Sequence, residues 1–324
     1  MPAAAVEKLE PLREALSGLL EEIRSQQRRA LEPRRESSAG IEWDSLFDEL
    51  RRRVGTLGMV EREPAVDDFG MQADFVERLE PLLDFLYERY WRVDFVGQES
   101  LPSKGPVLYV ANRSGVLSWD GMMLSHAIDR STPQLGRPRF LVEDALLQLP
   151  FAQAQLARVG GVRACRENVE QLISRGHSVI AFPEGARAAS RSFRERYQVG
   201  HFGSGDEIAA AIEARVRVVP VGIVGAEEAY PRLGDLATLS KLISRELRLP
   251  ALPITPIFPL LGPLGLLPLP SKWVIAVGKP ISPPDLERLV AAEGLASSQP
   301  SEVLREEVQR LVEQALDARS SIWN

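Results

Sequence analysis

Two short polar stretches that follow apolar runs contain the side chains best suited to chemistry. ANRSGVLSWD includes Arg113 and Asp120, and FPEG includes Glu184 and Gly185. A tight turn at FPEG would present the Glu184 carboxylate, and Gly185 would let a ligand approach the backbone closely. Arg113 cannot act as a base because its guanidinium stays protonated, although a fixed cation can bind a phosphate or stabilise an oxyanion. If Arg113 lies beside Asp120, it lowers the pKa of that carboxylate and makes it a weaker base.

Histidine is the usual general base, and the chain has three histidines. His126 follows Asp120 by six residues on one predicted helix and therefore points to a different face. His177 precedes a predicted strand, as turn residues do. His201 lies in the loop after FPEG and is the one that could swing into a site there. Cys165 is the single cysteine, so we expect no disulfide framework, no zinc cluster and no tightly bound metal.

Arginine is concentrated in one stretch of an otherwise acidic chain. The net charge is −6 and the pI is about 5.4, which gives no overall reason to bind nucleic acid. Between residues 187 and 196, four arginines stand against the single acid Glu195: Arg187, Arg191, Arg194 and Arg196. Such a local reversal of charge could hold phosphate groups, and the alternative is a solvated surface loop.

Short β-branched runs alternate with helical patterns over most of the chain. We predict strands near residues 107–111, 139–142, 178–182, 216–224 and 273–277, and helices near residues 74–91, 120–129, 144–159, 167–175 and 206–215. This alternation predicts an α/β fold, a mixed sheet flanked by helices, with ligands at the carboxyl ends of the strands. We divide the chain into a helical N-terminal region at 1–72 with a linker near 36–42, a domain at 73–283, and C-terminal helices at 284–324.

The N-terminal region contains a narrow apolar stripe, made of Leu9, Leu12, Leu16, Leu19 and Ile23. A stripe of this kind needs a partner, so helix-mediated self-association is one expectation and packing within the chain is the other. The arginines between residues 24 and 35 are either a solvated face or a contact to anionic lipid headgroups. Residues 251–270 are apolar but include six prolines, which excludes a transmembrane helix and leaves a packed loop or a surface that contacts a bilayer. Acidic residues stand where a signal peptide would be basic, so we expect a cytoplasmic protein that contacts the membrane peripherally.

Four segments in order carry a resemblance to a known family. They are ANRSGVLSWDGMML, RVGGVRA, FPEGARA and VVPVGIVGAEE, at residues 111–124, 158–164, 182–188 and 218–228. Together they resemble the four blocks of the lysophospholipid and glycerol-phosphate acyltransferase superfamily, over residues 73–283. The resemblance implies transfer of an acyl group from an acyl-coenzyme A or acyl carrier protein thioester to a hydroxyl of a glycerolipid acceptor. The thioester would be a co-substrate, and the resemblance implies no tightly bound cofactor.

The first block departs from the family pattern. That pattern is NHxxxxD, in which the histidine is the general base and the aspartate orients its ring. Here Asn112 is followed by Arg113, and Asp120 lies eight residues after Asn112 where the family places its aspartate six residues after the asparagine. The resemblance therefore places Arg113 and Asp120 at the catalytic position, with no histidine there.

The other blocks imply substrate-binding residues. By resemblance Asn112 belongs to the binding site, Arg163 would contact the acceptor's phosphate, and the Glu184–Gly185 turn would meet a glycerol hydroxyl. Ala186 replaces the family's threonine, whereas Arg187 keeps the cation that follows. Pro220 would set the end of a strand at the rim of the site.

Three functions agree with these observations. The first is an active acyltransferase in which substrate, water or His201 accepts the proton. The second is a non-catalytic relative that binds a lipid or an acyl thioester, or that scaffolds partners, because Arg113 stands where the histidine should be. The third is an unrelated α/β hydrolase or transferase, which the absence of a G-x-S-x-G stretch disfavours.

Overall fold

The computed structural model describes residues 65–113, 118–147, 152–190, 195–229, 268–292 and 299–321, together with Ser45, Leu46, Asp48, Glu49 and Arg52. The chain divides into two compact units, residues 1–48 and residues 49–324, and the fold below is that of the second unit. The leucine stripe, the arginines between residues 24 and 35, the linker near 36–42 and the apolar stretch up to residue 267 lie outside the described residues.

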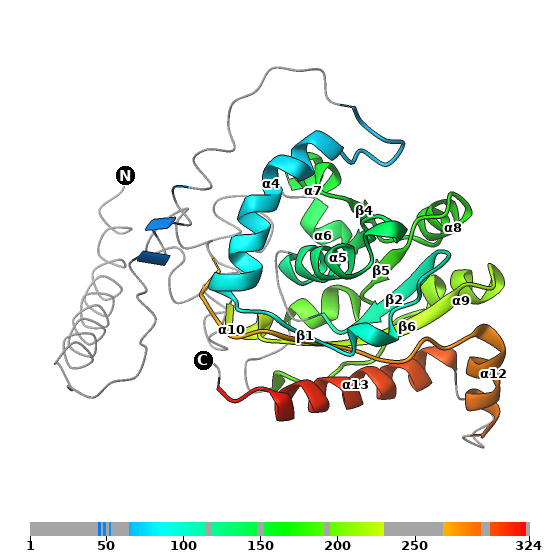
Figure 1. Ribbon diagram of the computed structural model, residues 1–324. Coiled ribbons are helices and arrows are strands. Elements are labelled where there is room, and N and C mark those ends of the chain that lie inside the picture. The colour runs from blue at the N-terminus through cyan, green and yellow to red at the C-terminus, as the bar shows by residue number, and fades with distance from the viewer. Residues whose placement is uncertain are drawn as a thin grey trace, which may run out of the picture. The chain divides into compact units, whose positions relative to one another are not determined.

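A seven-stranded sheet forms the centre of this unit (Figure 1). Its strands are β1 (Asp94–Val96), β2 (Val107–Ala111), β3 (Arg139–Val142), β4 (Gly161–Arg163), β5 (Val179–Ala181), β6 (Arg217–Val224) and β7 (Val274–Val277). Their order is β1-β7-β6-β2-β5-β3-β4. Every neighbouring pair is parallel except β6 and β7, which are antiparallel. The predicted mixed sheet is confirmed.

Helices cover both faces of the sheet (Figure 1). They are α4 (Ala73–Phe85), which continues as a π-helical turn to Tyr90, α5 (Trp119–Ser131), α6 (Asp144–Leu147), α7 (Ala152–Arg158), α8 (Arg166–Ser174), α9 (Asp206–Glu213), α10 (Ala226–Ala229), α12 (Pro283–Ala292) and α13 (Pro300–Ala318). Short 3₁₀ turns lie at Gln98–Ser100, Pro133–Leu135 and Gly185–Ser190. No helix within the described residues is long and apolar enough to cross a membrane.

Successive side chains of each strand point to opposite faces of the sheet, so each strand contributes to the core on both faces. Leu108, Val110 and Leu141 belong to one cluster with residues of α8, α9 and α13. Phe140 points to the opposite face, where it packs against Gly121 of α5. Strands buried on both sides are typical of a largely parallel sheet.

One glycine lets the C-terminal helix lie directly on the sheet. A Cβ atom on Gly222 of β6 would come within 2.6 Å of the backbone of Leu311 and Val312 in α13. Only a residue without a side chain allows this approach, so α13 is seated on β6 at backbone distance.

Candidate functional site

The parallel strands bring polar residues to one edge of the sheet, which we call the C-terminal edge. Arg113 follows the end of β2, Glu143 follows β3, Arg163 ends β4, and Glu184 follows β5. Ligands of open α/β sheets bind at this edge. The structure thus gathers residues that are up to 71 positions apart in the chain.

The Glu184 carboxylate connects two backbone segments at the C-terminal edge. Its Oε1 accepts a hydrogen bond from the backbone N–H of Arg113 at 2.8 Å, and its Oε2 accepts one from the backbone N–H of Gly200 at 2.6 Å. Glu184 is 3% exposed, so these bonds form in a poorly solvated place where they are strong. Glu184 therefore fixes the backbone that carries Arg113. Contact of this carboxylate with a glycerol hydroxyl stays a prediction.

The guanidinium of Arg113 is buried, and two of its nitrogens have no hydrogen-bond partner among the described residues. The residue is 3% exposed. Its Nη2 donates to Ser118 Oγ at 3.3 Å, and its Cζ lies 5.5 Å from the centre of the Phe182 ring. Nε and Nη1 are buried and have no hydrogen-bond partner in the described part of the chain. Buried donors of a cation are costly when unpaired, so this guanidinium is ready to receive an anionic or carbonyl oxygen.

Ser118 accepts a hydrogen bond from Arg113, a contact that the sequence analysis did not predict. It lies six residues after Asn112, the spacing that the family pattern gives its aspartate, so counting from Asn112 would have found it. Asp120 is fully buried at the start of α5, where its Oδ1 accepts the backbone N–H of Gly121 at 2.9 Å. A catalytic role of Asp120 stays a prediction.

Asn112 joins two strands. Its Nδ2 donates to the carbonyl of Ile223 at 2.9 Å, and the N–H of Ile223 donates to its Oδ1 at 2.7 Å. This reciprocal pair extends the contact between β2 and β6 to the residue before Arg113. Asn112 thereby fixes the start of the loop that carries Arg113.

The prediction that Pro220 sets the end of a strand at the rim of the site is wrong. It lies inside β6, where it pairs with Val110 of β2, so it does not set a strand end at a rim. The apolar run simply continues past it to Val224. A role of Pro220 in binding substrate stays a prediction.

The cations expected to bind phosphate lie in different surroundings. Arg163 is exposed and forms a two-bond ion pair with Asp144, at 2.6 and 2.8 Å. The hydrogen bond from Arg163 lowers the pKa of the Asp144 carboxyl. Arg187 is exposed on the 3₁₀ turn Gly185–Ser190, directly after the turn at Gly185, whose φ is +63°. Arg191 and Arg194 lie outside the described residues.

None of the three histidines lies against Arg113. His126 is buried, with Nε2 3.0 Å from Asp84. His177 packs edge-on against Phe69 and precedes β5, at the opposite edge of the sheet. His201 is 68% exposed and its Nδ1 lies 3.7 Å from Glu302 of α13. The His201 ring therefore lies near Glu302, although the backbone N–H of its neighbour Gly200 donates to Glu184.

Glu143 is a further site residue that the sequence reasoning missed. It is half-buried directly after β3, and a Cβ atom on Gly185 would lie 3.5 Å from its Oε1. Burial raises the pKa of Glu143, the positive charge of Arg113 lowers it, and Asp144 raises it. An acid placed directly after a fully buried strand is the signal that would have found it.

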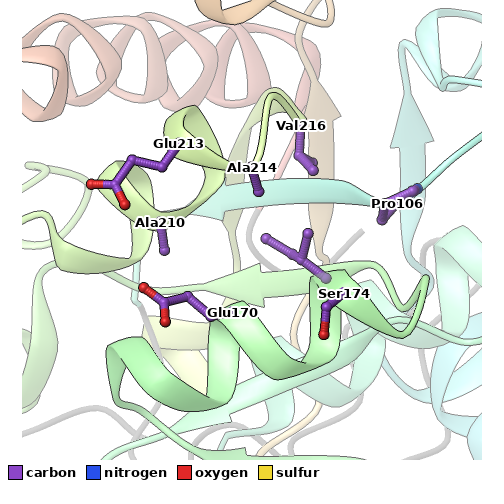
Figure 2. A pocket seen from close by; sticks show the side chains of 8 residues that line it. Pro106, Glu170, Ser174, Ala210, Glu213, Ala214 and Val216 are labelled. Carbon is purple, nitrogen blue, oxygen red and sulfur yellow. The ribbon is translucent and has the colours of Figure 1, made fainter.

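A separate hollow lies at the other edge of the sheet (Figure 2). It measures about 320 Å³ and is lined by residues of α8 and α9 and by Pro106 and Val216, which precede β2 and β6. Figure 2 shows Glu170 and Glu213 at one end of it, and both carboxylates are paired with Arg166. This hollow is not part of the C-terminal edge.

Comparison with known proteins assigns the class of this chain. The family model described as Acyltransferase matches residues 92–224, a span that runs from β1 to the end of β6. The chain belongs to the acyltransferase family.

Similar proteins are found in mycobacteria. An uncharacterized protein of Mycobacterium leprae is 35% identical over 259 residues, which cover 80% of this chain and 70% of that protein. An uncharacterized protein of Mycobacterium tuberculosis is 37% identical over 260 residues, which cover 80% of this chain and 72% of that protein. Among solved structures, the 1-acyl-sn-glycerophosphate (LPA) acyltransferase PlsC from Thermotoga maritima aligns with a TM-score of 0.47 at 18% identity, over 87% of this chain and 98% of that chain.

Proposed function

We propose that this protein transfers an acyl group from a coenzyme A or acyl carrier protein thioester to the hydroxyl of a glycerol-phosphate or lysophospholipid acceptor. Membership of the acyltransferase family supports the reaction type. The observation that carries the proposal is the Arg113 guanidinium, which is buried at the C-terminal edge with Nε and Nη1 unpaired among the described groups. A site built to receive an oxygen anion suits acyl transfer, because attack on a thioester carbonyl creates one.

Each side chain at this edge then has a role. Arg113 donates hydrogen bonds to the oxyanion that forms on the thioester carbonyl. Glu184 and Asn112 hold the backbone on either side of that cation through the bonds described above. Arg163 and Arg187, both exposed, attract the phosphate groups of acceptor and donor. For Arg163 this requires exchanging Asp144 for phosphate, which its planar donor fork binds equally well.

We place this reaction on the cytoplasmic side of a membrane, where the chain makes a peripheral contact. A glycerolipid acceptor resides in that surface, and the N-terminal arginines would add about 1 kcal/mol each near anionic lipid. Co-sedimentation of the full chain with vesicles of phosphatidylglycerol and with vesicles of phosphatidylcholine tests this contact. Binding to the anionic vesicles alone is expected, and binding to neither contradicts it.

Product analysis tests the reaction. Purified protein is given labelled long-chain acyl-coenzyme A and, separately, glycerol 3-phosphate and a panel of lysophospholipids, and the labelled ester is separated and counted. Ester formation that requires one of these acceptors is expected. Hydrolysis of the thioester without ester formation, or no reaction with any acceptor, contradicts the proposal.

A second candidate is a non-catalytic relative that binds the lipid or the acyl thioester. It is favoured by Arg113, since none of the chain's histidines lies against this cation. Calorimetric titration with long-chain acyl-coenzyme A separates the two candidates. Tight binding by a protein that forms no ester, with ester formation gained in Arg113→His, would establish the second.

A further inference from the structure

Glu143 is a carboxylate at the C-terminal edge to which the reaction so far gives no role. It occupies the position between β3 and α6. Its backbone carbonyl accepts the N–H groups of Leu146 at 3.0 Å and Leu147 at 3.3 Å. The first turn of α6 therefore fixes the main chain at Glu143, and with it the position of the Glu143 Cα atom.

The carboxylate of Glu143 packs over the turn that carries Glu184. The Cβ position of Gly185 lies 3.5 Å from Glu143 Oε1 and 3.9 Å from Oε2. Since the N–H of Arg113 bonds Glu184, one residue before Gly185, the segments that carry Glu143 and Arg113 adjoin the same turn. The positive charge of Arg113 also lowers the pKa of Glu143.

Within the part of the chain that the structure describes, the Glu143 carboxylate accepts no hydrogen bond and forms no ion pair. Three charged groups surround it on different elements: Arg113 after β2, Asp144 on α6 and Glu207 on α9. Burial and the neighbouring acid raise the pKa of Glu143 more than Arg113 lowers it. A carboxylate of this kind accepts a proton better than an ordinary exposed glutamate.

We infer that Glu143 is the proton acceptor of this acyltransferase, and that the roles of base and oxyanion binder are divided between Glu143 and Arg113. The inference rests on the proposed function. It removes the difficulty posed by the first block, because the chain needs no histidine if the carboxylate after β3, which lies across β5 from β2, takes the proton. It also explains why a guanidinium is tolerated at Arg113, where it serves as a donor only.

The reaction balances with these two groups. The acceptor hydroxyl gives its proton to the Glu143 carboxylate while its oxygen bonds to the thioester carbon, and the carbonyl oxygen becomes an oxyanion that Arg113 Nε–H and Nη1–H bind. The carbonyl then re-forms, the carbon–sulfur bond breaks, and the leaving thiolate takes the proton back from Glu143. The products are an ester and a free thiol, with both side chains restored.

Ester formation by Glu143→Gln, measured against wild type and the matched surface control Glu170→Gln, tests the inference. We expect kcat to fall roughly 100- to 10,000-fold in Glu143→Gln, the usual contribution of a general base, and to stay at the wild-type value in Glu170→Gln. Formate or acetate should restore part of the activity of Glu143→Ala, because a small carboxylate can occupy the vacated place. Thermal melting checks that each variant is folded, and Glu143→Asp keeps the chemistry if Gln disturbs the packing.

The pH profile distinguishes a base from a structural residue. A base must be ionised, so wild-type kcat should rise with pH through the raised pKa of Glu143. Arg113→Gln removes the charge that lowers this pKa and should move the acidic limb to higher pH, while Asp144→Asn should move it to lower pH.

Failure of the inference can be told apart from failure of the proposed function. The role of Glu143 is overturned if the wild type is active and Glu143→Gln keeps kcat within about threefold of it. It is also overturned if the acidic limb of the pH profile stays at the same pH in Arg113→Gln and in Asp144→Asn. Both results are compatible with the proposed acyltransferase activity. A wild type that forms no ester overturns both the inference and the proposed function.

Discussion

Replacing Arg113 by methionine should separate a functional cation from a structural one. Methionine fills much of the same volume but donates no hydrogen bond. The guanidinium is 3% exposed, with one bond to Ser118 and with Nε and Nη1 unpaired among described groups. Each buried donor without an acceptor costs about 1–3 kcal/mol, and the lost bond is worth about 1 kcal/mol. Removing the two unpaired donors gains about 2–6 kcal/mol, so we predict that the free energy of unfolding of Arg113→Met rises by about 1–5 kcal/mol.

Activity should move in the opposite direction. Loss of one preorganised oxyanion donor typically lowers kcat by about 10²- to 10³-fold, or about 2.7–4 kcal/mol of transition-state stabilisation. Urea unfolding followed by circular dichroism gives the stability, and ester formation gives kcat. A protein that gains or keeps stability while losing most of its turnover matches the assignment of Arg113 to the reaction.

Arg319 provides the matched control for this experiment. Its side chain is 3% exposed, and its Nη1 lies 3.0 Å from the equally buried Glu228 carboxylate. Arg319→Met leaves the buried Glu228 carboxylate with the Tyr197 hydroxyl but without its cation, so the free energy of unfolding should fall by about 3–5 kcal/mol. If Arg113→Met is destabilised to a similar extent, Arg113 is a structural residue and the reasoning about its unpaired donors is wrong.

Three further predictions concern the scaffold. Gly222→Ala places a Cβ against the Leu311 backbone and should lower the urea midpoint by the equivalent of about 1–3 kcal/mol or more; an unchanged midpoint would mean that α13 moves freely on β6. Glu184→Ala removes the acceptor of two backbone N–H groups and should cost about 2–4 kcal/mol of unfolding free energy; a smaller loss with unaltered kcat would deny it the role of fixing Arg113. Burial, followed by the bond to Glu228, raises the pKa of Tyr197 to about 12, so its contribution to stability is present below the ordinary tyrosine pKa and is lost as pH rises toward 12. Thermal melts between neutral pH and that value should fall more steeply for wild type than for Tyr197→Phe, and equal slopes would contradict the burial of this hydroxyl.

Much of the fold could be predicted because its strands are continuous apolar runs. The predictions at residues 107–111 and 139–142 match β2 and β3, and those at 216–224 and 273–277 differ from β6 and β7 by one residue. β4 was not predicted because its three residues, Gly161–Arg163, are too few to establish a period. Strand order was beyond the sequence, since it depends on pairings between residues more than 70 positions apart.

The site could be predicted only in part. Sequence reasoning found Arg113, Glu184 and Asn112, because they lie in the blocks that resemble the family. The role given to Asp120 stays a prediction, and the structure adds the hydrogen bond between Arg113 and Ser118. Glu143 was missed although it directly follows a fully buried strand, because the sequence does not show which strands are neighbours, and only the folded sheet places the ends of β2 and β3 on either side of β5.

The measurement that tests the central claim most directly is ester formation from long-chain acyl-coenzyme A and lysophospholipid or glycerol 3-phosphate, compared in wild type, Arg113→Met and Arg113→His. We predict turnover by wild type that depends on the acceptor and falls by about 10²-fold or more in Arg113→Met. A silent wild type with turnover gained in Arg113→His would contradict the claim, because it would show that this site lacks a base and that Arg113 is the reason.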